Sequence, residues 1–172
     1  MRFRKGLLIV LAAFCIALLG WVATRAPSGP RAIGFGERVP SFTLPTLKGE
    51  PVSLPPDNSA VLINYWASWC TPCREELPLL SRFAQQQGPA GIHVVAIALD
   101  DRTAAEEFVH ARSPDLTVLL EAPSDHDSSV RLGDDRSVLP FSVLIGADGR
   151  LKKRRFGAFR DADELRNWAN TP

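Results

Sequence analysis

Short apolar runs alternate with longer amphipathic stretches over most of this chain. Residues 61–66 and 92–99 are short, apolar and rich in β-branched or aromatic side chains, which is typical of strands buried on both faces. Between them, residues 71–87 carry apolar residues at helical spacing, which predicts an amphipathic helix. We expect the series to continue with a helix over 100–112, a strand over 116–120, one helical turn near 130–132 and a strand over 139–145.

Hairpin patterns lie at both ends of this series. Residues 36–54 fit two short strands joined by a turn at Lys48–Gly49. Near the C-terminus, the turn at 147–150 leads into an antiparallel strand over 151–156, and a helix over 161–169 follows. This order of elements indicates an α/β fold with a mixed central sheet, helices on both faces and an N-terminal β-hairpin extension.

The N-terminus has the pattern of a targeting segment. Arg2, Arg4 and Lys5 precede an uncharged apolar stretch over 6–23, which has the length of a short membrane-spanning helix. Because no good cleavage site follows, we favour an uncleaved signal anchor over 1–25 rather than a removed signal peptide. The positive residues are expected to stay in the cytoplasm, which places the rest of the chain in the periplasm or extracytoplasmic space as a single-pass protein of the inner membrane.

The remaining organisation is simple. Residues 26–35 begin with a Pro- and Gly-rich stretch that is typical of a linker, and residues 36–172 are long enough for one domain. The formal net charge of +1 provides no global basic field, so nucleic acid is not expected as a partner. The basic cluster at 152–155 is interpreted as a solvated strand edge.

Two cysteines, Cys70 and Cys73, directly follow the first buried strand. Cys70 is expected where that strand ends and a helix begins, with Pro72 in the first helical turn. Unpaired N–H groups and the positive end of the helix dipole favour a thiolate there. One thiol that attacks and a neighbour that resolves the mixed disulfide are what thiol–disulfide exchange requires. The alternatives are half of a zinc site or a purely structural disulfide, but Cys15 is the only other cysteine and the three histidines are scattered.

The segment 64–78, with the sequence NYWASWCTPCREELP, carries a family resemblance. It resembles the signature N-F-W-A-x-W-C-x-P-C-x-x-E-x-P of TlpA/ResA-type membrane-anchored thiol-disulfide oxidoreductases of the thioredoxin superfamily. The hairpin over 40–54, the sequence Val138–Leu139–Pro140 and the turn at 147–150 are similar to further parts of that family. The resemblance implies a thioredoxin-like redox domain over 36–172.

The resemblance also implies catalytic roles. Cys70 would be the attacking thiol, Cys73 the resolving thiol, and their disulfide the redox centre, with no other cofactor and no metal. Glu76 matches the family's active-site glutamate. It is three residues after Cys73 and therefore on the same helical face, where a carboxylate could exchange a proton with that thiol. The alternative is a solvated glutamate, which is our interpretation of Glu75.

Substrate-binding roles follow from the same resemblance. Pro140 would be cis and lie against the disulfide, and the backbone of Leu139 would pair with an extended substrate peptide. Trp69 would shield the disulfide and contact substrate, and Thr71 with Pro72 would tune the redox potential. One departure from the family pattern is Phe141–Ser142 in place of two threonines. A second departure is Asn64, where cytoplasmic thioredoxins bury an aspartate, and residues 115–136 match the family poorly.

The implied partners are protein disulfides, either apocytochrome c cysteines or thiols of copper-site assembly proteins, and a thiol-reducing electron donor in the membrane. The sequence leaves three alternatives open. A disulfide oxidant would have the same fold and the opposite direction of transfer, and a peroxidase is suggested by the N-terminal hairpin. A copper-binding assembly factor would use both cysteines as soft ligands, with His126 as the only candidate for a third.

Overall fold

The structure is a computed structural model and describes residues 14–17, 31–88, 90–112 and 115–171. Residues 14–17 form an exposed helical turn, and Arg31–Pro172 form a compact unit of their own. Most of the predicted signal anchor over 1–25 lies outside the described residues. Within the described part of the chain, no helix has the length and apolar character that crossing a membrane requires. The predicted linker over 26–35 is described only from Arg31, and the backbone N–H of Ile33 donates to the carbonyl of Arg131 at 2.9 Å.

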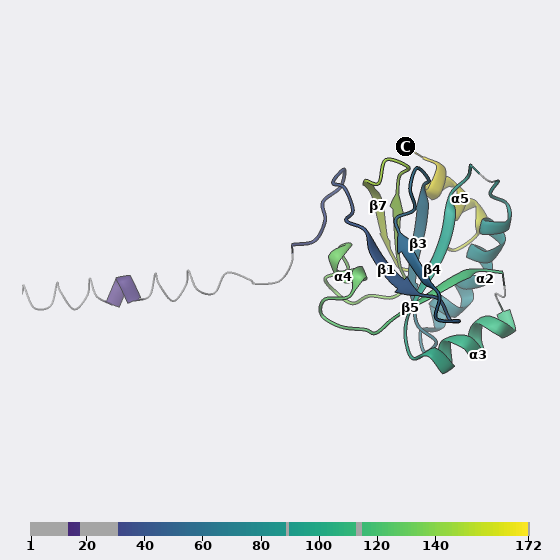
Figure 1. Cartoon of the computed structure of the whole chain (residues 1–172), viewed down its shortest axis with the longest axis horizontal. Coiled ribbons are helices and arrows are strands. Elements are labelled where there is room, and N and C mark those ends of the chain that lie inside the picture. Colours follow the sequence, from purple (N-terminus) through teal and green to yellow (C-terminus); the bar gives the residue numbers. More distant parts are fainter. Residues whose placement is uncertain (1–13, 18–30, 89, 113–114, 172) are drawn as a thin grey trace, which may run out of the picture. The chain divides into compact units, whose positions relative to one another are not determined.

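A five-stranded sheet forms the centre of the compact unit (Figure 1). Its strand order is β5-β4-β3-β6-β7, in which β3, β4 and β5 are parallel and β6 and β7 run antiparallel to their neighbours. This confirms the predicted mixed sheet. The strands are β3 (Val61–Trp66), β4 (His93–Leu99), β5 (Thr117–Glu121), β6 (Phe141–Ile145) and β7 (Leu151–Phe156).

Helices cover the two faces of the sheet unequally. One face packs against three helices, α2 (Thr71–Gln85), α3 (Arg102–Arg112) and α5 (Ala162–Asn170), as Figure 1 shows. The other face packs against residues near the short α4 (Ser128–Arg131) and against the hairpin of β1 (Phe42–Pro45) and β2 (Pro51–Leu54). The expected helices on both faces and the N-terminal hairpin are confirmed, although a single turn and the hairpin replace long helices on the second face.

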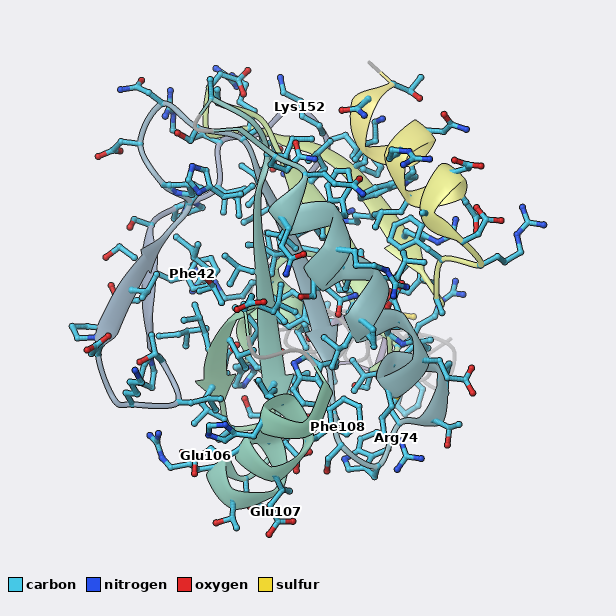
Figure 2. All side chains as sticks on the ribbon, turned by 90° about the vertical axis from the view of Figure 1, so that its right-hand side faces the viewer. Phe42, Arg74, Glu106, Glu107, Phe108 and Lys152 are labelled. Atoms are coloured by element: carbon cyan, nitrogen blue, oxygen red, sulfur yellow. A yellow bond between two sulfur atoms is a disulfide. The ribbon has the colours of Figure 1, made fainter. Side chains whose placement is uncertain are left out.

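Consecutive residues of β3 point to opposite faces because side chains alternate along a strand. Leu62 and Trp66 belong to the core beneath the helices, whereas Ile63 and Tyr65 belong to the core beneath the hairpin and α4. All six residues of β3 are buried, as the apolar run predicts for a central strand. The strand ends at Trp66, four residues before Cys70, so the sheet presents the cysteine segment at one end. Figure 2 shows Arg74, which follows Cys73, and Lys152, which begins the run of basic residues on β7, at opposite ends of the sheet.

The start of β6 differs from the prediction over 139–145. The strand begins at Phe141, because Pro140 has no N–H to contribute to a ladder. Leu139 and Pro140 therefore belong to the loop that leads into the strand.

The basic residues of β7 contact the rest of the chain. Lys153 Nζ donates to the carbonyl of Trp168 at 2.6 Å. Arg154 donates to the carbonyls of Leu132 and Ile33. Arg155 Nη2 is 3.0 Å from Glu164 Oε1. The interpretation of this cluster as a solvated edge is wrong for these three side chains, which tie the edge strand to neighbouring segments.

Candidate active site

Cys70 lies at the junction of β3 and α2, as the sequence predicts. It is the N-cap of α2, with φ −85° and ψ 102°, and Thr71 and Pro72 occupy the first turn. The backbone N–H of Cys73 donates to Cys70 Sγ at 3.3 Å. In the reduced protein the same N–H and the helix dipole would stabilise a thiolate on Cys70.

The two cysteines form a disulfide, with their Cα atoms 5.3 Å apart. Cys70 is 5% exposed and Cys73 is 0% exposed, so of the two residues only Cys70 has surface that a partner can contact. Trp69 directly before them is 71% exposed, whereas Trp66 is buried in the core. This asymmetry fits an attacking Cys70 and a resolving Cys73.

Glu76 lies one turn after Cys73 and is 2% exposed. Its Oε1 accepts the backbone N–H of Phe159 at 2.8 Å, and its Oε2 accepts Nδ2 of Asn64 at 3.1 Å. Burial raises the pKa of Glu76 to about 7, although both hydrogen bonds and the charge of Arg155 oppose the rise. The alternative of a solvated Glu76 is therefore wrong, and the buried carboxyl lies one helical turn after the buried Cys73. Its role as proton acceptor stays a prediction.

Asn64 connects Glu76 to β6. Its Nδ2 also donates to Ser142 Oγ at 2.9 Å, so both hydrogens of the amide are used. Ser142 belongs to the Phe141–Ser142 departure from the family pattern, and it is 1% exposed beneath the helices rather than at a substrate-facing rim. Asn64, which also departs from that pattern, is 0% exposed and is a neutral donor to the buried carboxylate.

Sequence reasoning missed the part of Arg155 and Phe159 in this site. Arg155 Nη2 donates to the carbonyl of Ala158 at 2.9 Å, and its guanidinium lies 4.5 Å from the ring centroid of Phe159. Arg155 thereby holds the turn that presents the N–H of Phe159 to Glu76. These residues are about 80 positions from Glu76, and no motif in the sequence connects them.

The loop before β6 has the predicted backbone geometry. The Leu139–Pro140 peptide bond is cis, which confirms that expectation, and Pro140 is buried. Leu139 is half-buried and, together with Trp69, lines a cavity of about 340 Å³. Substrate contact by Trp69, Leu139 and Pro140 and redox tuning by Thr71 and Pro72 stay predictions.

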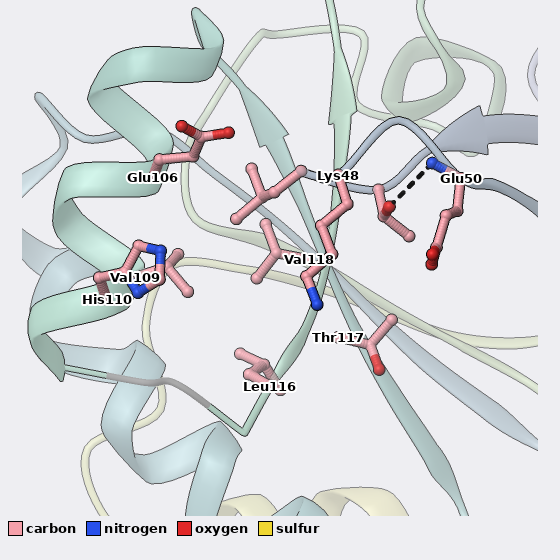
Figure 3. Close-up of a pocket in the computed structure, with 10 residues that line it drawn as sticks. Lys48, Glu50, Glu106, Val109, His110, Leu116, Thr117 and Val118 are labelled. Atoms are coloured by element: carbon pink, nitrogen blue, oxygen red, sulfur yellow. Dashed lines mark hydrogen bonds between the residues drawn. The ribbon is translucent and has the colours of Figure 1, made fainter.

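A second cavity, of about 330 Å³, lies between the β1–β2 turn, α3 and β5 (Figure 3). Lys48, Glu106 and His110 are among its lining residues, and none of the predicted site residues lines it. Within the described part of the chain, no group of three or more His, Cys, Asp or Glu residues is arranged to hold a metal ion. His126, the candidate third ligand of the copper alternative, is an exposed residue of the loop before α4.

Comparison with known proteins identifies a family and several relatives that this chain resembles. The sequence model of the AhpC/TSA family matches residues 35–165. Sporulation thiol-disulfide oxidoreductase A of Bacillus subtilis is 25% identical over 163 residues, which cover 92% of this chain and 95% of the relative. Thiol-disulfide oxidoreductase ResA of Bacillus subtilis is 29% identical over 153 residues, which cover 87% and 81%. The crystal structure of a thiol:disulfide interchange protein DsbE from Chlorobium tepidum aligns with a TM-score of 0.66 and 27% identity, and covers 77% of this chain and 92% of that one.

Proposed function

Because the chain belongs to the AhpC/TSA family and its relatives are thiol-disulfide oxidoreductases, we propose that it is a reductase of protein disulfides. The observation that carries the proposal is a Cys70–Cys73 pair at a helix N-terminus with a buried carboxyl one turn behind it. Proline before the second cysteine supports the reducing direction.

In the first step, the thiolate of Cys70 attacks one sulfur of the substrate disulfide. The other substrate sulfur leaves as a thiolate and takes a proton from solvent. Cys70 is then joined to the substrate in a mixed disulfide. The greater exposure of Cys70 assigns this step to it.

In the second step, Cys73 loses its proton to Glu76 and attacks Cys70 Sγ. The bond between Cys70 and the substrate breaks, and the second substrate thiolate is released. The substrate has gained two electrons, and the Cys70–Cys73 disulfide has formed. A carboxyl with a pKa of about 7 is well matched to accept and return this proton at neutral pH.

The proposal includes a location and a class of partner. An anchor over 1–25 would hold the redox domain outside the inner membrane, and a membrane electron donor of the thiol-reducing type would regenerate the dithiol. The charge pattern of residues 2–23 supports the anchor. Disulfides of apocytochrome c or of copper-site assembly proteins are the proposed substrates, because the compartment oxidises thiols that these assembly reactions need reduced.

The deciding experiment is an equilibrium titration of the full-length protein against glutathione, with tryptophan fluorescence as the readout. A reduction potential near or below about −220 mV supports a reductase. A potential near about −120 mV would make the chain an oxidant and contradict the proposed direction.

Cys73→Ser should trap the mixed disulfide on Cys70, and Cys15→Ser is its matched control.

A further inference from the structure

The cavity beside Trp69 has an apolar part and an acidic part. Trp69, Leu99 and Leu139 supply the apolar part, and Asp125, Asp127 and Asp134 supply the acidic part. We propose that it binds a lysine or arginine side chain of the substrate, close in sequence to the cysteine that Cys70 attacks. This inference rests on the proposed function and adds a specificity site to it.

Asp134 is the central observation. It is 0% exposed and lines the cavity. Its Oδ1 accepts the backbone N–H of Val138 at 3.0 Å, but its Oδ2 is buried and has no hydrogen-bond partner among the described residues. Burial raises the pKa of Asp134 because water is removed from the charged form. Because Oδ2 has almost no accessible surface, a cation in the cavity would stabilise this carboxylate through its charge rather than through a direct hydrogen bond.

The other two aspartates differ in their roles. Asp127 caps α4, and its oxygens accept hydrogen bonds from the backbone N–H groups of Ser124, Ser129 and Val130. Both of its oxygens have hydrogen-bond donors, so it shapes the cavity and adds negative charge without requiring a new partner. Asp125 is exposed and can contribute to the negative potential at the entrance.

The lining matches a long basic side chain better than other classes. Lysine and arginine combine an apolar stem with a charged end, and Trp69 with Leu99 and Leu139 would contact the stem. An indole face also attracts a cation. No lysine or arginine is among the residues that line the cavity. Arg136 of the same loop lies 3.9 Å from Asp135, which is not a lining residue.

The cavity adjoins the reacting atoms through two of its lining residues. Trp69 directly precedes Cys70, and Leu139 directly precedes the cis proline. A substrate strand that pairs with Leu139 would direct every second side chain toward the protein. One of these side chains, within a few residues of the reacting cysteine, would enter the cavity.

The test uses three peptide disulfides that differ only at the position beside the cysteine. That position holds lysine in one peptide, norleucine in the second and glutamate in the third. The second-order rate of reduction by the reduced full-length protein is divided by the rate with dithiothreitol. This ratio removes the effect of peptide charge on the peptide's own cysteine. We expect the lysine peptide to react about tenfold faster than the norleucine peptide and the glutamate peptide to react slowest.

Variants locate the effect. Asp134→Asn keeps an oxygen for the Val138 N–H and removes the charge, so the lysine preference should fall to about twofold or less. Asp135→Asn is the matched control, because Asp135 is exposed and does not line the cavity, and it should keep the preference. If Asp134→Asn does not fold, the exposed Asp125→Asn should lower the preference about threefold.

Equal relative rates for the three peptides would overturn the inference, and so would an equal loss of preference in Asp134→Asn and Asp135→Asn. Failure to reduce even the norleucine peptide would instead contradict the proposed function. The two failures are therefore distinguishable.

Discussion

Asn64 and Tyr65 are neighbours in β3, yet each begins a different buried polar cluster. Asn64 points beneath the helices and donates to Glu76 and Ser142. Tyr65 points to the opposite face, where its hydroxyl lies 2.8 Å from Ser128 Oγ, and Ser128 Oγ donates to Glu121.

Both clusters contain a glutamate with a raised pKa, but their surroundings differ. Glu76 is almost fully buried, its donors are an amide and a backbone N–H, and it lies one turn from Cys73. Glu121 is half-buried, and Ser128 holds it through both its hydroxyl and its backbone N–H. The first arrangement suits the proton exchange that we propose between Glu76 and Cys73, whereas the second fixes α4 to the end of β5. Burial raises the pKa of both carboxyls, so the proposed reactivity of Glu76 depends on its position relative to the cysteines rather than on burial alone.

The largest expected difference between the two clusters concerns the rate at which the mixed disulfide is resolved. Glu76→Gln should slow resolution of the mixed disulfide by about 100-fold, because the proton acceptor for Cys73 is lost. The wild-type rate should rise with pH through about 7, and this rise should be absent in Glu76→Gln. Stopped-flow kinetics over pH 5–9 would measure both effects.

Glu75→Gln is the control on the same helix, and Glu121→Gln is the control in the other cluster. Both should keep the pH dependence of the wild type. An equal loss in the rate of mixed-disulfide resolution in Glu75→Gln and Glu76→Gln would contradict a role specific to Glu76.

The next difference is in stability. Glu76 binds a proton more tightly in the folded than in the unfolded chain. Its protonation therefore contributes most to the free energy of unfolding of the oxidised protein below about pH 4.5. Stability should fall as pH rises through about 7, and a pKa shift from 4.5 to about 7 corresponds to about 3 kcal/mol. Denaturant unfolding at pH 5 and pH 8 should show this loss in the wild type and a flatter response in Glu76→Gln. Equal pH dependence in the two proteins would contradict the assignment.

The smallest effect is expected in the cluster around Ser128. Tyr65→Phe removes the hydroxyl that contacts Ser128 and should lower the free energy of unfolding by about 1 kcal/mol. The reduction potential and the rate should be unchanged, because Tyr65 faces away from α2. A shift of the potential in Tyr65→Phe would show that the two clusters are coupled through β3.

Local pattern predicted the elements that carry the redox centre. The apolar run of β3, the Cys-x-x-Cys spacing and Pro72 together placed Cys70 at the start of a helix, and that position is observed. The resemblance supplied the cis bond at Pro140, which pattern alone does not indicate.

Contacts between residues far apart in the chain could not be predicted from the sequence. Arg155 was interpreted as part of a solvated edge, because its contacts with Ala158 and Glu164 depend on how α5 packs against β7. In the loop before β6, the sequence predicts only one helical turn near 130–132 and no site. Its buried Asp134 becomes visible as a site only after folding brings it to the cavity beside Trp69 and Leu139.

The contacts of β7 also bear on solubility. β7 is an outer strand of the sheet, and outer strands are where a second chain can add and begin aggregation. Lys153 and Arg154 reach from this strand to the carbonyls of Trp168, Leu132 and Ile33, which places charged side chains and neighbouring segments along the edge. Strand addition is thereby discouraged at the β7 edge, whereas the proposed pairing with substrate uses the short loop at Leu139. A protein that pairs with substrate peptides, as we propose, can in this way avoid pairing with itself through β7.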